Sequence, residues 1–308
     1  MYSIKDIDII ITTKNRSVDL LFTIDHMLSL GFVEDQFYII DDGSTDGTDS
    51  LIYSKYPKIH LEKNPSSLGY MVNRSKMMKE TKRSYILSLD DDSHIRTKED
   101  VKEAIRILES DPEFGIFHFR VFNQIQDPPE KSVLADKFRI LRGYIGCGHI
   151  IKREVIEKLG SYRNELVFYC EEIDYSLRAF KLGYKVVSND NLIVHHRIDM
   201  GLREKQKTSV NAKGIYGREW RNIHLYSNNL IITLIYYPAG IGFLFLLYRI
   251  FLAFKFMVLK EQQFLAFFKM LGRFFSFVPY CFKEMKKLSY KEFKAWFSNP
   301  DFTDAGSV

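Results

Sequence analysis

Three consecutive aspartates, Asp90–Asp92, are the residues of this sequence with the clearest capacity for chemistry. They directly follow the apolar run "YILSL" (85–89), so we expect them at the edge of a buried layer. Carboxylates side by side repel one another and are costly to desolvate unless a positive group lies among them. A divalent cation that bridges them to a diphosphate would supply that charge and stabilise a phosphate leaving group. The alternative, a solvated acidic turn, stays open on this stretch alone.

A second acidic pair, Asp41 and Asp42, follows the apolar run "FYII" (37–40) and begins the stretch "DDGSTDGT". If Asp42 began an EF-hand calcium loop, the twelfth position would be Tyr53, whereas an EF-hand requires a bidentate Glu there. An EF-hand is therefore not expected. Neither a G-x-G-x-x-G nor a Walker sequence occurs, so backbone amides of such loops are not the main phosphate ligands. We therefore expect phosphate to be bound through side chains and a metal ion.

Strands and helices alternate in the part of the sequence that carries these residues. Apolar runs predict strands over 7–13, 37–40 and 84–89, a third short strand is expected over 58–64 in "KIHLEKN", and helices lie between them. This alternation predicts a doubly wound, mostly parallel α/β sheet, in which ligands bind at the carboxyl ends of the strands. Thr12 and Thr13, which end the first run, then lie on the same rim as both acidic groups.

Composition and cysteine usage narrow the class of protein. The chain has 308 residues, of which 46% are hydrophobic and 27% charged, as in a globular protein. Cys147, Cys170 and Cys281 lie far apart without metal-ligand spacing, which indicates a reducing compartment and neither a disulfide framework nor a zinc site. The charged N-terminus lacks the layout of a signal peptide, so we expect the catalytic part in the cytoplasm.

The C-terminal region differs in both hydrophobicity and charge. Residues 225–248 form a segment without any charged side chain, and this segment is long enough to span a bilayer. Two asparagines, a proline and two glycines within it weaken that interpretation. Residues 249–294 hold ten Lys and Arg against three Glu, interleaved with phenylalanines as in an interfacial helix. A buried helical hairpin is the alternative. Nucleic-acid binding is disfavoured, because the cations do not line a polar face.

Seven motifs occur in the order found in family 2 glycosyltransferases of GT-A fold, and the chain resembles that family over residues 5–200. They are "IIITTKNR", "IIDDGSTDGT", "SLGYMVNRSKMM", "LSLDDDSHI", "GCGHIIKREVIEKLG", "FYCEEIDYSLRAFKLGYKV" and "VHHR". The resemblance implies a nucleotide-sugar-binding half (1–97) and an acceptor-binding half (98–205). The hydrophobic and basic composition of residues 206–308 predicts a helical C-terminal region that associates with a membrane.

The resemblance also implies residues that bind the nucleotide. Thr12, Lys14 and Asp42 match positions that contact the base and ribose, with Asp41 beside them. Two further matches complete this set. Arg74 in "VNRS" would face the nucleotide, although Ser75 stands where the family often has Asn. Asp91, or alternatively Asp90, would lie near the ribose.

The family's metal-binding D-x-D element corresponds to Asp90 and Asp92, with Asp92 the principal ligand of Mn²⁺ or Mg²⁺. His195 resembles the histidine that some members add as a further metal ligand, and His196 is the alternate. The alternative to metal binding is a structural role, which is more common for a single histidine in a strand. Cys147 and His149 are not expected to form a catalytic pair, because this chemistry needs no nucleophile.

Sugar transfer with inversion requires a carboxylate that takes the proton of the acceptor hydroxyl. The family usually has Glu-Asp at the corresponding helix start, so Glu172 is the matching base and Glu171 the alternative. Both are equally consistent with ordinary first-turn acids, which the helix dipole favours.

These residues together predict a metal-dependent, inverting glycosyltransferase at the cytoplasmic face of a membrane. It is expected to move a sugar from a nucleotide-sugar to a glycan or lipid-linked acceptor. A metal-dependent nucleotidyltransferase or nucleotide-sugar hydrolase, and a non-catalytic nucleotide-binding subunit, are the alternatives. The sequence does not specify the donor sugar, the nucleoside or the acceptor.

Overall fold

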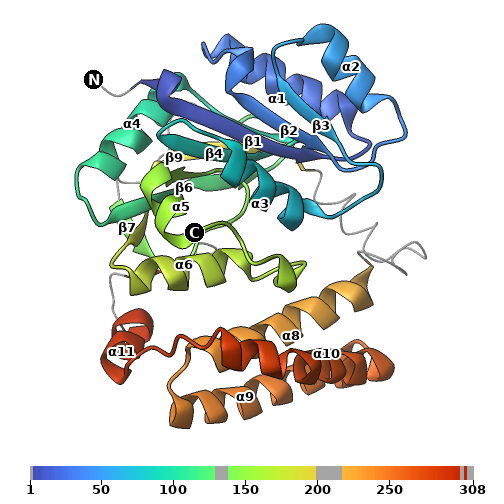
Figure 1. Cartoon of the computed structure of the whole chain (residues 1–308), viewed down its shortest axis with the longest axis vertical. Coiled ribbons are helices and arrows are strands. Elements are labelled where there is room, and N and C mark those ends of the chain that lie inside the picture. Colours follow the sequence, from blue (N-terminus) through green and yellow to red (C-terminus); the bar gives the residue numbers. More distant parts are fainter. Residues whose placement is uncertain (1–2, 129–137, 199–216, 299–301, 304–308) are drawn as a thin grey trace. The chain divides into compact units, whose positions relative to one another are not determined.

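The computed structural model describes residues 3–128, 138–198, 217–298 and 302–303, which belong to two compact units (Figure 1). The first, here called the sheet unit, comprises Met1–Asn164, Arg178–Met200 and Asp301–Val308. The second, the helical unit, comprises Glu165–Leu177 and Gly201–Pro300. Both predicted halves, 1–97 and 98–205, contribute strands to one sheet, and the boundary at residue 97 stays a prediction.

The sheet unit is built on a mixed sheet with strand order β10-β7-β9-β6-β8-β4-β1-β2-β3, and β5 pairs with β9 off this path. Its strands are β1 (Ile7–Thr13), β2 (Phe37–Asp41), β3 (His60–Lys63), β4 (Tyr85–Asp90), β5 (Ser93–Ile95), β6 (Phe114–Asn123), β7 (Phe138–Leu141), β8 (His149–Lys152), β9 (Lys185–His196) and β10 (Phe302–Thr303). The four predicted strands, β1 to β4, pair in parallel in the order β4-β1-β2-β3, as expected. The expected α/β class is thus confirmed.

The central strands are apolar on both faces because helices cover the sheet. Ile7, Ile9 and Ile11 of β1 are fully buried, as are Leu87 and Leu89 of β4. The covering helices are α1 (Ser17–Ser29), α2 (Thr48–Lys55), α3 (Tyr70–Glu80), α4 (Lys98–Glu109) and α5 (Arg153–Leu159). The apolar faces of α1, α2 and α4 form one continuous core with the strands, which fixes the carboxyl ends of β1, β2 and β4.

The helical unit contains the C-terminal helices and the start of helix α6 (Glu171–Lys181). Its other elements are α8 (Arg218–Tyr236), α9 (Ala239–Ala253), the π-helix η5 (Phe254–Lys260), α10 (Phe264–Lys283) and α11 (Tyr290–Ser298). The length of the uncharged run 225–248 suggested one continuous span, but the structure divides it between two helices. Helix α8 ends at Tyr236 and α9 begins after Pro238. Pro238 precedes α9 because it lacks the amide that an uninterrupted helix would use.

Asp42 fixes the loop between β3 and α3. Its Oδ1 accepts hydrogen bonds from Asn64 Nδ2 at 2.9 Å and Leu68 N at 2.8 Å, and its Oδ2 accepts from Ser67 Oγ and Gly69 N. Burial alone would raise the pKa of Asp42, but these hydrogen bonds, led by that of Ser67, lower it to about 2. The ionised carboxylate therefore holds the start of α3 against the end of β2.

We expect Asp42→Asn to reduce the free energy of unfolding by about 2 kcal/mol at pH 7, from the pKa shift. A group with a lowered folded-state pKa stabilises above its unfolded pKa, and that contribution disappears as the pH falls from about 4 to about 2. The difference between the two proteins should therefore shrink at low pH, which urea unfolding at pH 7 and about pH 3 measures. Glu99→Gln, at a side chain that is 76% exposed, is the control. An Asp42→Asn effect that is equal at both pH values would contradict this role.

Candidate active site

Three strand ends form the rim on which the predicted residues lie. Thr12 of β1 is the register partner of Asp90 of β4, and Thr13 is the partner of Asp41 of β2. The backbone continues this contact, since Asp42 N donates to Thr13 O at 2.8 Å. The expectation that these ends share one edge of the sheet is confirmed.

The three consecutive aspartates point in different directions. Asp91 turns inward, where it accepts a hydrogen bond from Thr13 Oγ1 at 2.9 Å, and burial raises its pKa to about 7. Asp90 and Asp92 both face His196, whose Nε2 lies 3.8 Å from Asp90 Oδ2 and 3.1 Å from Asp92 Oδ1. Burial opposes the ionisation of Asp92, but His196 and Arg16 outweigh it and hold its pKa below the usual range. The first and third aspartates thus form one site, as a D-x-D element requires.

Two arginines supply positive charge to this cluster. Arg16, just before α1, places Nη2 2.7 Å from Asp92 Oδ2 and Nη1 3.1 Å from Asp91 Oδ1. Arg74 of α3 pairs with Asp90 and lies against the ring of Tyr70. The sequence interpretation assigned this charge to a metal ion alone and did not single out Arg16. The signal was available, because Arg16 closely follows β1, the strand beside β4.

The structure brings His196, and not His195, to the carboxylates. Successive side chains of β9 point to opposite faces of the sheet, so only one of the two histidines can face Asp90 and Asp92. His195 Nε2 lies 2.9 Å from the carbonyl oxygen of Gln124, and its ring contacts that of His94. The assignment of His195 as a ligand therefore does not fit this geometry, whereas its alternate does.

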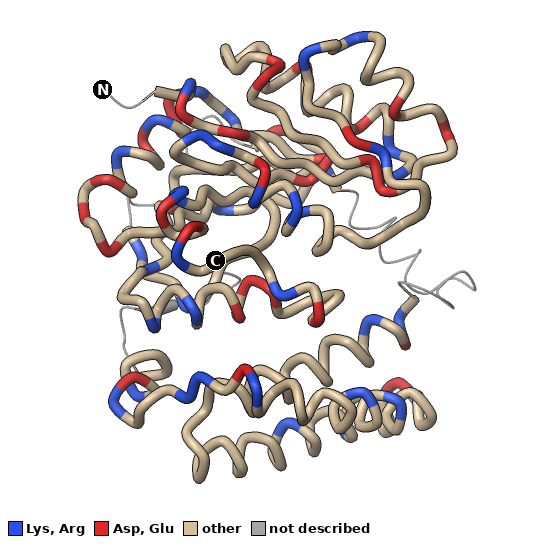
Figure 2. Tube along the Cα trace, in the orientation of Figure 1, with Lys and Arg blue, Asp and Glu red and all other residues tan. Residues whose placement is uncertain are grey.

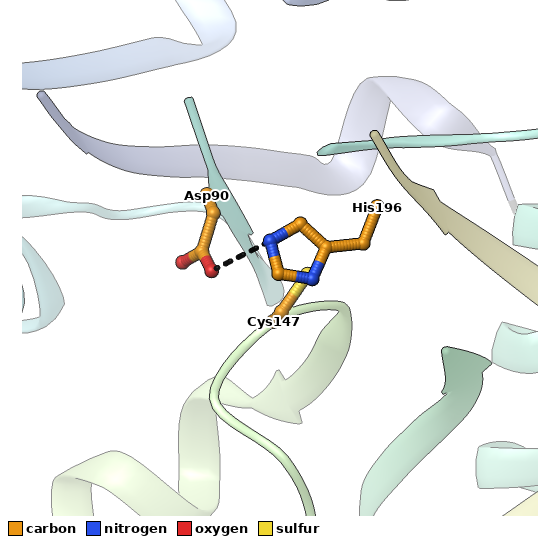
Figure 3. A group of neighbouring side chains, drawn as sticks. All are labelled: Asp90, Cys147 and His196. Atoms are coloured by element: carbon orange, nitrogen blue, oxygen red, sulfur yellow. Dashed lines mark ion pairs between the residues drawn. The ribbon is translucent and has the colours of Figure 1, made fainter. Parts of the chain in front are cut away.

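Cys147 lies beside the same group (Figure 3). Ligand atoms of Asp90, Cys147 and His196 all lie within 4.8 Å of one another. The following residue, Gly148, has φ +75°, and a Cβ there would lie 2.5 Å from a methyl group of Val194. Glycine is thus required to bring this loop against β9. Burial raises the pKa of the Cys147 thiol well above its usual value, so it is protonated at neutral pH.

His149 is directed away from a catalytic pairing with Cys147. Its Nε2 lies 3.2 Å from Tyr162 Oη, which in turn is 2.9 Å from Tyr144 Oη. Burial lowers the pKa of His149 well below its usual value. These contacts indicate a neutral histidine with a packing role.

Buried polar atoms without a hydrogen-bond partner among the described residues include Thr12 Oγ1, Asp41 Oδ2 and Asp92 Oδ1 on the rim. Thr12 and Asp41 lie at the ends of the neighbouring strands β1 and β2. Asp41 Oδ1 accepts a hydrogen bond from Ser44 N at 2.8 Å, which orients the carboxylate. Lys14 is exposed beside them. Buried polar atoms without a hydrogen-bond partner are rare and point to a ligand. The Asp42 carboxylate differs, because the protein itself donates all four of the hydrogen bonds described for it above.

Glu171 and Glu172 belong to the helical unit, at the start of α6. The turn before them has positive φ at Val167, Tyr169 and Cys170, a conformation that side chains rarely adopt. Surrounding hydrogen bonds must therefore determine this turn.

Asn228 of α8 supplies those hydrogen bonds. Its Nδ2 lies 2.8 Å from the carbonyl oxygens of Leu166 and Phe168 and 3.0 Å from that of Tyr169. Arg273 of α10 orients the amide by donating to Asn228 Oδ1 at 2.7 Å. From the sequence alone, Asn228 is recognisable only as a polar interruption of an apolar run, and Arg273 only as a positive charge. A buried amide in an apolar helix was the available signal.

Several solved structures are similar to this chain. The mannosyltransferase PcManGT from Pyrobaculum calidifontis, in complex with GDP-Man and Mn²⁺, gives a TM-score of 0.53 at 14% identity over 89% of this chain and 75% of that chain. S. aureus TarS 1–349 gives 0.52 at 14% identity over 95% and 78%. GalNAc-T7 with UDP, GalNAc and Mn²⁺ gives 0.51 at 14% identity over 62% of this chain and 43% of that chain, so the match spans less than half of that protein.

At these identities the similarity establishes the fold, which is GT-A. No curated protein sequence matches the chain. The sequence model of one family, Glycosyl transferase family 2, matches residues 8–160, which include β1 to β4, the three aspartates and Cys147. The chain is therefore a member of glycosyl transferase family 2.

Proposed function

We propose that this glycosyltransferase moves one sugar, with inversion, from a nucleoside diphosphate sugar to a hydroxyl group of a glycan or lipid-linked acceptor. Surface polysaccharide or cell-envelope glycan synthesis, at the cytoplasmic face of a membrane, is the proposed setting. The observation that carries the proposal is the convergence of Asp90, Asp92 and His196 on one point of the rim. The unsatisfied oxygens of Thr12 and Asp41 near that rim support a bound nucleotide.

Asp90, Asp92 and His196 would hold the metal ion. Two carboxylates and an imidazole suit Mn²⁺ or Mg²⁺, which prefer oxygen and tolerate nitrogen ligands. The solved structures of PcManGT and GalNAc-T7 contain Mn²⁺. When bound, such an ion neutralises the charge that develops on the departing diphosphate. The soft sulfur of Cys147 is a poor match for Mn²⁺ and Mg²⁺, which prefer oxygen ligands, so we assign it no metal-binding role.

Other rim residues are proposed to bind and orient the nucleotide. Thr12 Oγ1 and Asp41 Oδ2 would exchange hydrogen bonds with the base or ribose, since both are buried and available. Arg74 and the exposed Lys14 would attract the diphosphate, because guanidinium and ammonium groups are strong phosphate partners. Asp42 and Asp91 would act indirectly, by fixing the loop before α3 and the start of α1.

The base is proposed to be Glu172, with Glu171 as the alternative. Inverting transfer needs a carboxylate that accepts the proton of the attacking hydroxyl. Both glutamates stand in the first turn of α6, where the helix dipole favours negatively charged side chains. Asn228 fixes the turn that precedes them, so their position does not depend on a mobile loop.

The two histidines of β9 provide a matched test of the metal site. We expect His196→Gln and Asp92→Asn each to weaken Mn²⁺ binding by about tenfold or more, because each removes a ligand. His195→Gln should change Mn²⁺ affinity less than about twofold, since its ring contacts Gln124 and His94 instead. Electron paramagnetic resonance of free Mn²⁺ during a titration measures the Mn²⁺ affinity of the parent protein and of these three variants. Equal losses in both histidine variants would contradict the assignment.

The chemistry is tested by Glu172→Gln, assayed with a panel of nucleotide-sugars. We expect turnover to fall by about 10²- to 10⁴-fold while nucleoside diphosphate affinity is unchanged, because the base acts only in the chemical step. Glu171→Gln is the matched control and should lose much less. Release of pyrophosphate instead of nucleoside diphosphate would indicate nucleotidyl transfer, and release without an acceptor would indicate hydrolysis. Biological activity that survives Glu172→Gln would favour a non-catalytic binding subunit.

A further inference from the structure

Two helical segments of the helical unit are long and apolar enough to cross a membrane, judged by length and composition. They are Ala239–Lys260, which combines α9 and η5, and Phe264–Lys283, which is α10. We infer that neither segment spans a bilayer and that both lie in the plane of an anionic membrane surface, as a monotopic anchor. This inference specifies the membrane part of the proposed function and does not depend on the transfer chemistry.

An arginine lies near the middle of each segment. Arg249 is close to the midpoint of Ala239–Lys260, and Arg273 is close to the midpoint of Phe264–Lys283. If either segment spanned a membrane, its guanidinium group would lie near the bilayer centre. Arginine is among the residues least tolerated at that depth. The average hydropathy of both segments is therefore high enough for a membrane span, but the central position of their arginines is unfavourable for one.

Both arginines are already hydrogen-bonded to α8 or its C-terminus. Arg249 Nη1 donates to Asn229 O at 2.6 Å, and its Nη2 donates to Tyr237 Oη at 3.0 Å. Arg273 Nη1 donates to Ser227 Oγ at 2.6 Å as well as to Asn228. Insertion across a bilayer would break these bonds or take α8 into the lipid with its buried polar side chains. We conclude that α9 and α10 stay packed on α8.

The opposite sides of both helices expose rows of large apolar side chains. On α9, six residues spaced as one helical face have exposed fractions between 37% and 64%: Phe243, Leu244, Leu247, Tyr248, Phe251 and Leu252. On α10, five residues have exposed fractions between 53% and 74%: Phe264, Leu265, Phe268, Phe275 and Phe282. Exposed apolar surface of this extent marks an interaction site.

The charges around these rows identify a membrane surface as the partner. Lys255, Lys260, Lys269 and Lys283 are exposed on the same elements, and Figure 2 shows few acidic residues there. One of the acids, Glu261, is paired with Arg218. Apolar rows with flanking lysines match a helix that buries one face among acyl chains and places its cations on anionic headgroups. A second copy of the chain would repel the same positive face.

Vesicle flotation tests this surface. The full-length protein should bind phosphatidylglycerol-containing vesicles more tightly than phosphatidylcholine vesicles. Phe243→Ser/Leu247→Ser/Phe251→Ser should weaken that binding by about tenfold or more, through lost apolar partitioning. The control, Val18→Ser/Leu51→Ser/Tyr53→Ser, removes three exposed apolar side chains of the sheet unit and should bind as the parent does.

Thiol labelling distinguishes an in-plane helix from a spanning one. Gly240→Cys and Lys260→Cys place single thiols at exposed positions near the two ends of the α9–η5 segment. With protein bound to the outside of sealed vesicles, a membrane-impermeant maleimide should label both variants equally above the background of the parent. Labelling of only one of them would show that the segment spans the bilayer and would overturn the inference.

Three other results would also overturn it: no binding of the parent to anionic vesicles, unchanged binding of the α9 triple variant, or a lipid-free dimer that this variant abolishes. The vesicle assays need neither donor nor metal ion. Loss of sugar transfer in Glu172→Gln with retained flotation would therefore test the proposed function separately. Conversely, failure of flotation in a protein that still transfers sugar would refute only the membrane surface.

Discussion

The structure depends on how negative charge is held at the carboxyl end of β4. Three aspartates in sequence at the edge of a buried sheet would repel one another, and each of their neighbours reduces that repulsion differently. Arg16 pairs with Asp91 and Asp92, and Arg74 pairs with Asp90. His196 completes the group from β9. Charge compensation therefore connects the end of β4 with α3, with the residue before α1 and with the distant strand β9, and it defines the point at which a cation and a diphosphate are proposed to bind.

Carboxylates on this rim divide into those that build the site and those available to a ligand. Asp42 and Asp91 are buried and bonded to protein donors, so they fix loops. Asp41 Oδ2 and Asp92 Oδ1 have no hydrogen-bond partner among the described residues, although Asp92 Oδ2 is bonded to Arg16. In the helical unit, Arg273 has a comparable double role: it orients the amide that fixes the turn before Glu171, and it keeps α10 against α8.

Much of the fold was predictable, because β1, β2 and β4 are apolar runs bounded by polar turns, and parallel strands align their carboxyl ends. The insertion of β8 between β4 and β6 was not, since it depends on pairing between distant segments. The choice between His195 and His196 depends on the register of β9, where a shift of one residue exchanges the faces. Composition likewise suggested a span over 225–248, whereas the break at Pro238 and the contacts of Arg249 are local and tertiary details that an average hides.

The central claim is that a divalent cation and a nucleoside diphosphate bind together at Asp90, Asp92 and His196. A crystal structure with Mn²⁺ and a nucleoside diphosphate, recorded at the manganese absorption edge, tests it most directly. The account predicts one anomalous peak bonded to at least one of the two aspartates and to His196, with the base or ribose at Thr12 and Asp41. A nucleotide bound at this rim without such a peak, or a peak at another site, would contradict it.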